Sequence, residues 1–505
     1  MSTQDVVLNR EAAPSPTAWL HNATVFGSLA LGLLALVWTW FSYEYIEDDA
    51  FIHLEFARSV AGGLGFSFND TVTNGDTAPL WVLLITLIHA FHLDWIACAK
   101  LACAAGLAVA VTGAWRLAGD LPRERAAHDL LPFAAVAVTI LNPYFVHWSF
   151  SGMEATAALG LSFWILWAVF LGELTVQRAL FAAALLGLGP LLRPELLVFG
   201  ALVGPVLLWR FWRAHENESR AFRLATSFGL GILMMLPVCL WCGYALHAFG
   251  SVVPNTNLAK RGGEIGAIAS RLIPVYAMGF PVTLLLLPVA CVLGMRRRPS
   301  SDFIWPGTIW PGIIWALLLW PTACIAFYLV NHTVVQTRYC LLSMPSMSIA
   351  VLWLLGRVGS PRLLAGAAAG MLLASLFVIV SIVIPHVRNK EELREKFASV
   401  STFIRTNVPP REPVAVLAIG QIEFESRHRL VDLGGITQPQ VLHYLNDSQA
   451  TLRWAKAQGA RYFAGNSSPE ADAVPVFDVD VPYLGWTLRR TAYRETQHYG
   501  VYRLP

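Results

Sequence analysis

The sequence predicts a polytopic α-helical membrane protein, with about eleven membrane-crossing helices and a small C-terminal α/β domain outside the membrane. Of its 505 residues, 56% are hydrophobic and only 14% are charged, whereas a soluble protein carries about a quarter charged residues. The mean hydropathy is +0.54. The apolar residues are concentrated upstream of residue 386, and residues 386–505 have an ordinary share of charge. The net charge of +3 gives no indication of nucleic-acid binding.

Apolar runs long enough to cross a bilayer, which takes about 20 residues, follow one another through the first three quarters of the chain. The eleven runs cover residues 24–42, 95–117, 130–147, 155–173, 179–193, 195–212, 224–247, 273–294, 309–330, 340–356 and 363–385. The first is too long for a signal peptide and has no small-residue cleavage site, so we expect an uncleaved anchor. Residues 79–93 are apolar but too short to cross, and we expect them to be re-entrant or interfacial.

The placement of arginine predicts the orientation in the membrane. Four connectors are basic, and they contain Arg116, Arg123 and Arg125, then Arg210, Arg213, Arg220 and Arg223, then Arg296, Arg297 and Arg298, and finally Arg357 and Arg362. Basic residues of short loops stay in the cytoplasm. Eleven crossings from a cytoplasmic N-terminus put all four connectors inside. We therefore expect a bacterial inner-membrane protein with a transmembrane domain over 1–385, a first outer loop over 43–94, and a periplasmic domain over 386–505.

Two adjacent carboxylates, Asp48 and Asp49, follow the first predicted span on the outer side. Because adjacent carboxylates repel, at least one of them tends to have a raised pKa or to bind a cation. This suits a general base that removes a proton from a hydroxyl group, or a ligand for Mg²⁺ or Ca²⁺. A solvated helix end explains the same two residues, so their spacing leaves both interpretations open.

Further ionisable and polar side chains fall on the same predicted outer face. Ionisable groups at membrane depth cost free energy, so their presence there indicates function. They are Arg58, Glu154, Arg193, Glu195, Asn255, Lys260, Arg338 and Tyr339. Cations on the outer side suit an anionic substrate, and Arg338 could bind a phosphate through two parallel hydrogen bonds. Structural explanations stay open, because Arg193 and Glu195 can pair with each other and Arg58 can reach lipid headgroups.

The C-terminal residues 386–505 alternate between strand and helix patterns. Buried strands are predicted at 414–419, 430–433 and 461–464, and a helix between 438 and 459. This alternation favours a small α/β sandwich. No pattern in it indicates a separate active site, so it either binds the acceptor, covers the membrane site or serves as a structural cap.

Taken in order, these segments resemble the GT-C glycosyltransferases, and among them the terminal arabinofuranosyltransferases of mycobacterial-type cell-wall arabinan. In the first outer loop the resemblance is carried by Asp48-Asp49-Ala50-Phe51-Ile52, Phe56-Ala57-Arg58, Gly62-Gly63-Leu64-Gly65-Phe66, Asn69 and Gly75-Asp76-Thr77-Ala78-Pro79-Leu80-Trp81. Later segments follow in the family's order, namely Ser151-Gly152-Met153-Glu154-Ala155, Leu192-Arg193-Pro194-Glu195, Val253-Pro254-Asn255-Thr256, Ala259-Lys260, Arg338-Tyr339, Ile419-Gly420 and Val431-Asp432-Leu433-Gly434-Gly435.

The resemblance implies a transferase of cell-wall biogenesis that works at the outer face of the inner membrane. It would move a sugar, preferably an arabinofuranose-like pentose, from a polyprenyl-phosphate donor to a cell-envelope glycan or lipid-linked acceptor. Its partners would be these substrates and membrane lipids, without nucleic acid. No cofactor is required by the sequence, although Mg²⁺ or Ca²⁺ between the Asp pair and the phosphate is compatible with it.

Residue by residue, the resemblance implies Asp48 or Asp49 as the catalytic base. The implied ligands of the donor phosphate or substrate are Arg58, Glu154, Arg193, Glu195, Asn255, Lys260, Arg338 and Tyr339. Two departures leave the sugar and acceptor open. The family often has Arg where this chain has Glu55, and its Gly-Tyr-Thr turn reads Gly75-Asp76-Thr77 here.

The main alternative is a lipid-linked sugar flippase or another transporter, which would also be polytopic and hold buried charges. Transporters typically show internal repeats and helices interrupted at the membrane midplane. The sequence shows no repeat, and its charged motifs gather on one predicted face. A receptor without enzymatic activity would leave the outer carboxylates and cations unexplained. The sequence therefore favours the enzyme.

Overall fold

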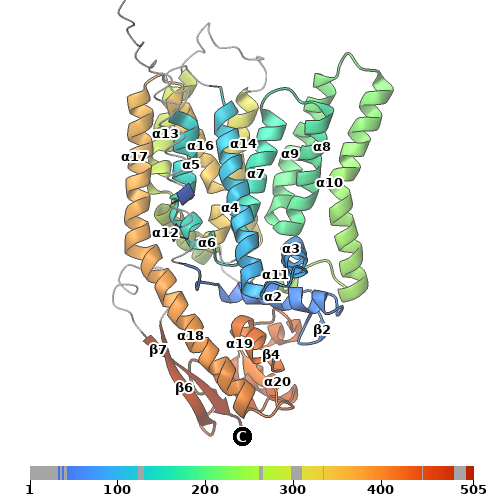
Figure 1. The fold of residues 1–505 in the computed structure, drawn as a ribbon, viewed down its shortest axis with the longest axis vertical. Coiled ribbons are helices and arrows are strands. Elements are labelled where there is room, and N and C mark those ends of the chain that lie inside the picture. Colours follow the sequence, from blue (N-terminus) through green and yellow to red (C-terminus); the bar gives the residue numbers. More distant parts are fainter. Residues whose placement is uncertain are drawn as a thin grey trace, which may run out of the picture.

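The structure is a computed structural model of the chain, and it describes residues 32–33, 37–38, 42–122, 130–260, 265–296, 310–333, 335–445, 447–482 and 496–505. A bundle of roughly parallel helices makes up most of the molecule, and a small sheet lies at one end of it (Figure 1). Helix α2 (Asp48–Ala61) lies across that end, between the bundle and the C-terminal part.

Six of the described helical segments are long and apolar enough to cross a membrane. They are α4 (Trp95–Asp120), α9 (Glu195–Ala214), α10 (Arg220–Phe249), α14 (Trp310–Val330), α15 with α16 (Thr337–Leu341 and Met344–Gly356), and α17 (Pro361–Val378) with its continuation. A bent pair brings the number to seven. The chain is thus a multi-pass membrane protein, but the predicted count of about eleven is not confirmed. The first predicted span, 24–42, lies almost entirely outside the described residues.

Two predicted spans are each broken into two helices. The run 130–147 forms α5 (Leu130–Ile140) and α6 (Pro143–Trp148), and the Asn142 side chain caps α6 by accepting from two backbone N–H groups. The run 273–294 forms α12 (Ile265–Gly279) and α13 (Pro281–Arg296), which meet at 86°. Hydropathy missed both breaks because it averages over a window, whereas each break depends on one proline, Pro143 or Pro281, which lacks the N–H that would continue the helix.

The described residues also contain shorter apolar helices of 10–17 residues. They are α3 (Pro79–His89), α7 (Ala155–Phe170) and α8 (Val176–Leu192), besides α5. Helices α4 and α7 approach closely at Gly160, where an added Cβ would lie 2.5 Å from the backbone nitrogen of Ala110. Small residues of this kind allow membrane helices to pack backbone to backbone.

Helix α3, which falls in the segment predicted to be re-entrant or interfacial, has 11 residues and packs against α2, α4 and α8. It lies at the end of the bundle that carries α2 (Figure 1). A hairpin of β1 (Ser67–Phe68) and β2 (Thr71–Val72) precedes it, and α11 (Asn255–Ala259) lies beside the same end. Its position relative to the lipid stays a prediction.

Helix α17 runs through a π-helical turn (Ile379–Val383) into α18 (Ile384–Asn407), which enters the C-terminal part. The sheet there has the order β4-β3-β5-β7-β6. Its strands are β3 (Val414–Val416), β4 (Leu430–Asp432), β5 (Tyr462–Gly465), β6 (Val474–Pro482) and β7 (Thr496–Arg503). The first three pair in parallel, and β7 joins β5 and β6 antiparallel.

The three predicted strands are therefore present, although the first, predicted over 414–419, ends at Val416. The sequence missed β6, β7 and α19 (Ile419–Ser426). The region predicted to be helical, 438–459, contains a 3₁₀ helix (Pro439–His443) and α20 (Ser448–Ala457) instead of one helix. One hydrophobic core continues from the bundle into this part, because Phe51 of α2 and Ile419 of α19 belong to the same buried cluster. The predicted α/β composition of the C-terminal part is confirmed.

Candidate active site

Asp48 and Asp49 occupy the first turn of α2, where the helix dipole favours negative charge. Beside them is a cavity of about 410 Å³ at the end of the bundle. Its lining comes from segments that are far apart in the sequence, and it consists of Glu47, Asp48, Asp49, His147, Trp148, Val275, Val335, Gln336, Thr337, Arg338, His386 and Lys390. The cavity thus combines three carboxylates, two cations and two histidines.

Asp49 is ion-paired with two of the predicted phosphate-binding cations. Its Oδ2 lies 2.7 Å from Arg338 Nη2 and 3.7 Å from Lys260 Nζ. Burial raises the pKa of Asp49, but Lys260 and Arg338 together bring the pKa well below the usual range of an aspartate. Asp49 is therefore a permanent anion that holds both cations beside the cavity.

Asp48 is held by neutral groups instead. Its Oδ1 accepts a hydrogen bond of 2.8 Å from the backbone N–H of Gln421, and its Oδ2 accepts one of 3.3 Å from Gly420 N–H. Burial raises the pKa of Asp48 to about 6; the two backbone N–H groups lower it, and the charge of Asp49 raises it further. The two adjacent carboxylates thus have different surroundings, because Asp49 is paired with cations and Asp48 is bound by neutral groups. Their mutual repulsion is one cause of the difference between their pKa values.

Arg193 lies at the centre of a buried polar network. Its Nη1 is 2.6 Å from Glu154 Oε1, and its Nε and Nη2 bind both oxygens of Glu195 at 3.0 and 2.6 Å. The Tyr328 hydroxyl also donates to Glu195. The guanidinium lies 5.0 Å from the ring centre of Tyr339. The Arg193–Glu195 pair expected as a structural explanation is present, and the network adds Glu154 to it.

The sequence analysis did not select His53, which connects this network through Asp76 to the segment between β2 and α3. His53 Nδ1 lies 2.5 Å from Asp76 Oδ2, and His53 Nε2 lies 3.3 Å from Glu154 Oε2. Burial lowers the pKa of His53, but the two carboxylates raise it to about 10, so the imidazole is a cation at neutral pH. The sequence signal that could have identified His53 is its spacing of four residues from Asp49, because residues i and i+4 share a helix face.

The structure does not bring Arg58 to the cavity. Its Nη1 donates to the carbonyl oxygen of Phe424 at 3.0 Å, its guanidinium lies over the Phe424 ring, and it pairs with Glu55. Glu55 also contacts Glu423 of α19, and burial together with this second carboxyl raises the pKa of Glu423 to about 9. Arg58 therefore belongs to the contact between α2 and the C-terminal part.

Asn255 is likewise outside the cavity lining. Its side chain donates to Thr73 Oγ1 at 3.2 Å, and its backbone N–H donates to the carbonyl oxygen of Asn74 at 2.8 Å. Thr256 adds a hydrogen bond to the carbonyl oxygen of Gly75. These contacts tie α11 to the segment between β2 and α3 and so position Lys260, which follows α11, beside Asp49.

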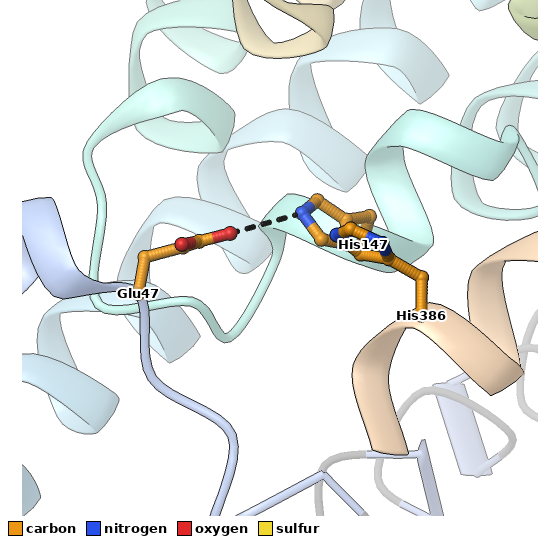
Figure 2. Close-up of side chains that lie close together, drawn as sticks. All are labelled: Glu47, His147 and His386. Atoms are coloured by element: carbon orange, nitrogen blue, oxygen red, sulfur yellow. Dashed lines mark ion pairs between the residues drawn. The ribbon is translucent and has the colours of Figure 1, made fainter. Parts of the chain in front are cut away.

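Four ionisable residues of the cavity lining were not predicted as site residues, namely Glu47, His147, His386 and Lys390, and three of them converge (Figure 2). Glu47 Oε1 lies 3.4 Å from His147 Nε2, and Glu47 Oε2 lies 2.7 Å from Lys390 Nζ. Donor atoms of Glu47, His147 and His386 all lie within 4.8 Å of one another. Only Glu47, next to the Asp pair, carried a sequence signal, because the histidines are isolated within or beside apolar runs.

Comparisons with known sequences find one matching family model and one curated relative. A family model described as "Domain of unknown function (DUF8728)" matches residues 385–502. A terminal β-(1→2)-arabinofuranosyltransferase of Corynebacterium glutamicum is 28% identical over 279 residues, which cover 48% of this chain and 36% of that protein. The matched region is thus little more than a third of the curated relative.

Two crystal structures of ArnT from Cupriavidus metallidurans have a similar fold. The structure bound to undecaprenyl phosphate matches with a TM-score of 0.58 at 13% identity, over 94% of this chain and 97% of that chain. The apo structure matches with a TM-score of 0.56 at 12% identity, over 95% and 98%. The likeness covers the bundle and the C-terminal part together. It confirms the GT-C fold expected from the ordered motifs.

Proposed function

We propose that this protein is a glycosyltransferase that moves a sugar from a polyprenyl-phosphate donor to an acceptor hydroxyl group. The observation that carries the proposal is the cavity of about 410 Å³, in which Asp48 and Asp49 face Arg338 and Lys390. A base for the acceptor and cations for the leaving phosphate are thus side by side. The arabinofuranosyltransferase relative and the undecaprenyl phosphate bound to ArnT support the same reaction type.

In this reaction the bond between the anomeric carbon and the phosphate oxygen breaks, and the electron pair leaves with the phosphate. The anomeric carbon develops positive charge as in other glycosyl transfers. The leaving group needs stabilisation of its negative charge, for which preorganised cations are effective. Arg338 and Lys390 line the cavity, and Lys260 lies within 3.7 Å of Asp49 at its edge.

Asp48 is the proposed general base, and Asp49 the proposed anchor for the cations. The charge of Asp49 is already balanced by Arg338 and Lys260. Asp48 is bound by two neutral N–H groups, which orient it and leave lone pairs on both oxygens. As the new bond forms, the acceptor hydroxyl passes its proton to Asp48.

The finer assignment follows the resemblance and the charge pattern. The donor sugar is an arabinofuranose-like pentose and the acceptor a cell-envelope glycan or lipid-linked saccharide, as the name of the C. glutamicum relative suggests. The arginine-rich connectors support a cytoplasmic N-terminus, with the active site and the C-terminal part on the periplasmic side of the inner membrane.

The test is to purify the protein in detergent and measure polyprenyl phosphate released from a panel of polyprenyl-phosphate sugars with several acceptors. We expect turnover with one donor, abolished by Asp48→Asn and strongly reduced by Asp49→Asn. Asp70→Asn is the matched control, because Asp70 is exposed in the same loop with φ 59°, which asparagine tolerates. Donor binding without release from any donor–acceptor pair would contradict the proposal and favour a transporter.

A further inference from the structure

We propose that Glu47, His147 and His386 form a binding site for a divalent transition metal ion of the zinc class. The ligands come from the segment preceding α2, from α6 and from α18, so they meet only in the folded protein (Figure 2). The proposal is independent of the glycosyltransferase reaction, because it concerns the affinity of these three side chains for an ion.

The distances fit a tetrahedral ion. Zinc binds histidine nitrogen and carboxylate oxygen at about 2.0–2.2 Å, which places two ligand atoms roughly 3.4 Å apart at the tetrahedral angle. Glu47 Oε1 and His147 Nε2 are 3.4 Å apart. The ligand atom of His386 lies within 4.8 Å of both, so a small side-chain rotation closes the set.

The donor set selects the class of metal. Two imidazoles and one carboxylate are ligands that zinc takes in open sites, where a fourth position remains for water or substrate. Mg²⁺ and Ca²⁺ prefer oxygen ligands alone. All three side chains are buried. All three also line the cavity of about 410 Å³, so the fourth position would face it and could take a water or an anionic oxygen.

The neighbours of the cluster are compatible with an ion. Lys390 binds Glu47 through Oε2, which leaves Oε1 directed at His147. An outer partner that orients a ligating carboxylate in this way is common around metal sites. The Tyr45 hydroxyl lies 3.0 Å from Glu47 Oε1 and 2.9 Å from His147 Nε2, so an ion must displace it or take it as a ligand.

The Asp48–Asp49 pair, predicted as a site for Mg²⁺ or Ca²⁺, is a poorer candidate. Asp49 already has two cations within 3.7 Å, and both oxygens of Asp48 accept backbone N–H groups. A divalent ion between them would face Arg338 and Lys260. Among the described residues, Glu47, His147 and His386 are the one group of three potential ligands close enough to share an ion.

The experiment measures metal content directly. The full chain is purified with a tag free of histidine, stripped with a chelator, dialysed against Zn²⁺ or Co²⁺, and analysed by inductively coupled plasma mass spectrometry. We expect one ion per chain and, with Co²⁺, the strong visible absorption of a four-coordinate site. Glu47→Gln, His147→Ala and His386→Ala should each reduce the bound ion to background, and an excess of Mg²⁺ should not compete.

His498→Gln is the matched control, because His498 lies on β7 with its side chain 44% exposed. It should retain the ion. Thermal unfolding without metal shows whether each variant is folded, and the isosteric Glu47→Gln remains informative if a histidine variant unfolds. Two results would overturn the proposal: a wild-type protein that stays metal-free after dialysis, or folded variants of all three residues that bind as much zinc as the wild type.

Discussion

The carboxylate of Asp48 accepts a hydrogen bond of 2.8 Å from the backbone N–H of Gln421, a residue 373 positions further along the chain. Gln421 lies in the first turn of α19, where backbone N–H groups have no partner within the helix. The C-terminal part therefore contacts the proposed base directly, through the positive end of a helix. The sequence left three roles open for the C-terminal part: it could bind the acceptor, cover the membrane site or serve as a structural cap.

Replacing Gln421 by proline removes the N–H that binds Asp48. Proline in the first turn costs the helix little, since that N–H is not used within it. The hydrogen bond to a charged group is worth about 1.5–3 kcal/mol, so we expect the turnover rate to fall about tenfold or more in Gln421→Pro. The measurement is release of polyprenyl phosphate under saturating donor.

Gln421→Ala is the control for that variant. It removes the side-chain hydrogen bonds to the carbonyl oxygen of Arg394 and to Glu425 but keeps the backbone N–H. We expect turnover within about twofold of the wild type. Equal losses of turnover in both variants would mean that the Gln421 side chain supports turnover, and not the Gln421 N–H that donates to Asp48.

Gly420 has no room for a side chain. An added Cβ would lie 2.0 Å from the carbonyl oxygen of Asp48 and 2.8 Å from its Oδ1. Gly420→Ala must therefore displace α19 or the first turn of α2, and we expect it to lower both turnover and the thermal unfolding temperature. Gly366→Ala on α17 is the control, because no atom lies within 4 Å of its added Cβ. A fully active Gly420→Ala would contradict the close packing.

Arg193 balances two buried carboxylates, Glu154 and Glu195. Removing one partner of a buried ion pair costs about 3–5 kcal/mol because it leaves an uncompensated charge. We expect Arg193→Met to lower the unfolding temperature in detergent strongly, and Arg193→Lys to lower it less, since lysine keeps the charge but loses the paired geometry. Unfolding temperatures that do not differ from the wild type would show that the network adds nothing to stability.

His53 is expected to make the folded protein less stable as the pH rises above neutral. In the unfolded chain a histidine has a pKa of about 6.5, and in the folded protein Asp76 and Glu154 outweigh burial and raise the pKa of His53 to about 10. Because the folded state binds the proton more tightly, the stabilisation is complete below about pH 6.5 and is lost as the pH rises to about 10.

The measurement for His53 is the unfolding temperature between pH 6 and 10. His53→Gln should be less stable than the wild type at pH 6, and the difference should shrink toward pH 10. Other groups also titrate in this window, among them Glu423 with its raised pKa, so the difference between the two proteins is the quantity to compare. A difference that is constant with pH would contradict the paired imidazolium.

Much of the fold could be predicted because membrane insertion depends on local properties. A run of about 20 apolar residues enters lipid wherever it stands in the chain, and α4, α9, α10, α14 and α17 each overlap a predicted run, with bounds that differ by a few residues. The breaks at Asn142 and Pro281 were missed because hydropathy averages over a window and does not register one capping side chain or one missing N–H. Strands β6 and β7 were missed as well.

The sequence alone determined that the chain is a multi-pass membrane protein, that Asp48 and Asp49 follow the first apolar run, and that the cations Lys260 and Arg338 belong to one predicted face. That the Asp pair begins a helix was decided by the structure. Only the tertiary structure decided which groups meet. It pairs Asp49 with Arg338 and Lys260, and it ties Asp48 to α19. It also removes Arg58 from the cavity. The physical reason is that composition and spacing act within a few turns of chain, whereas these contacts depend on how distant helices pack.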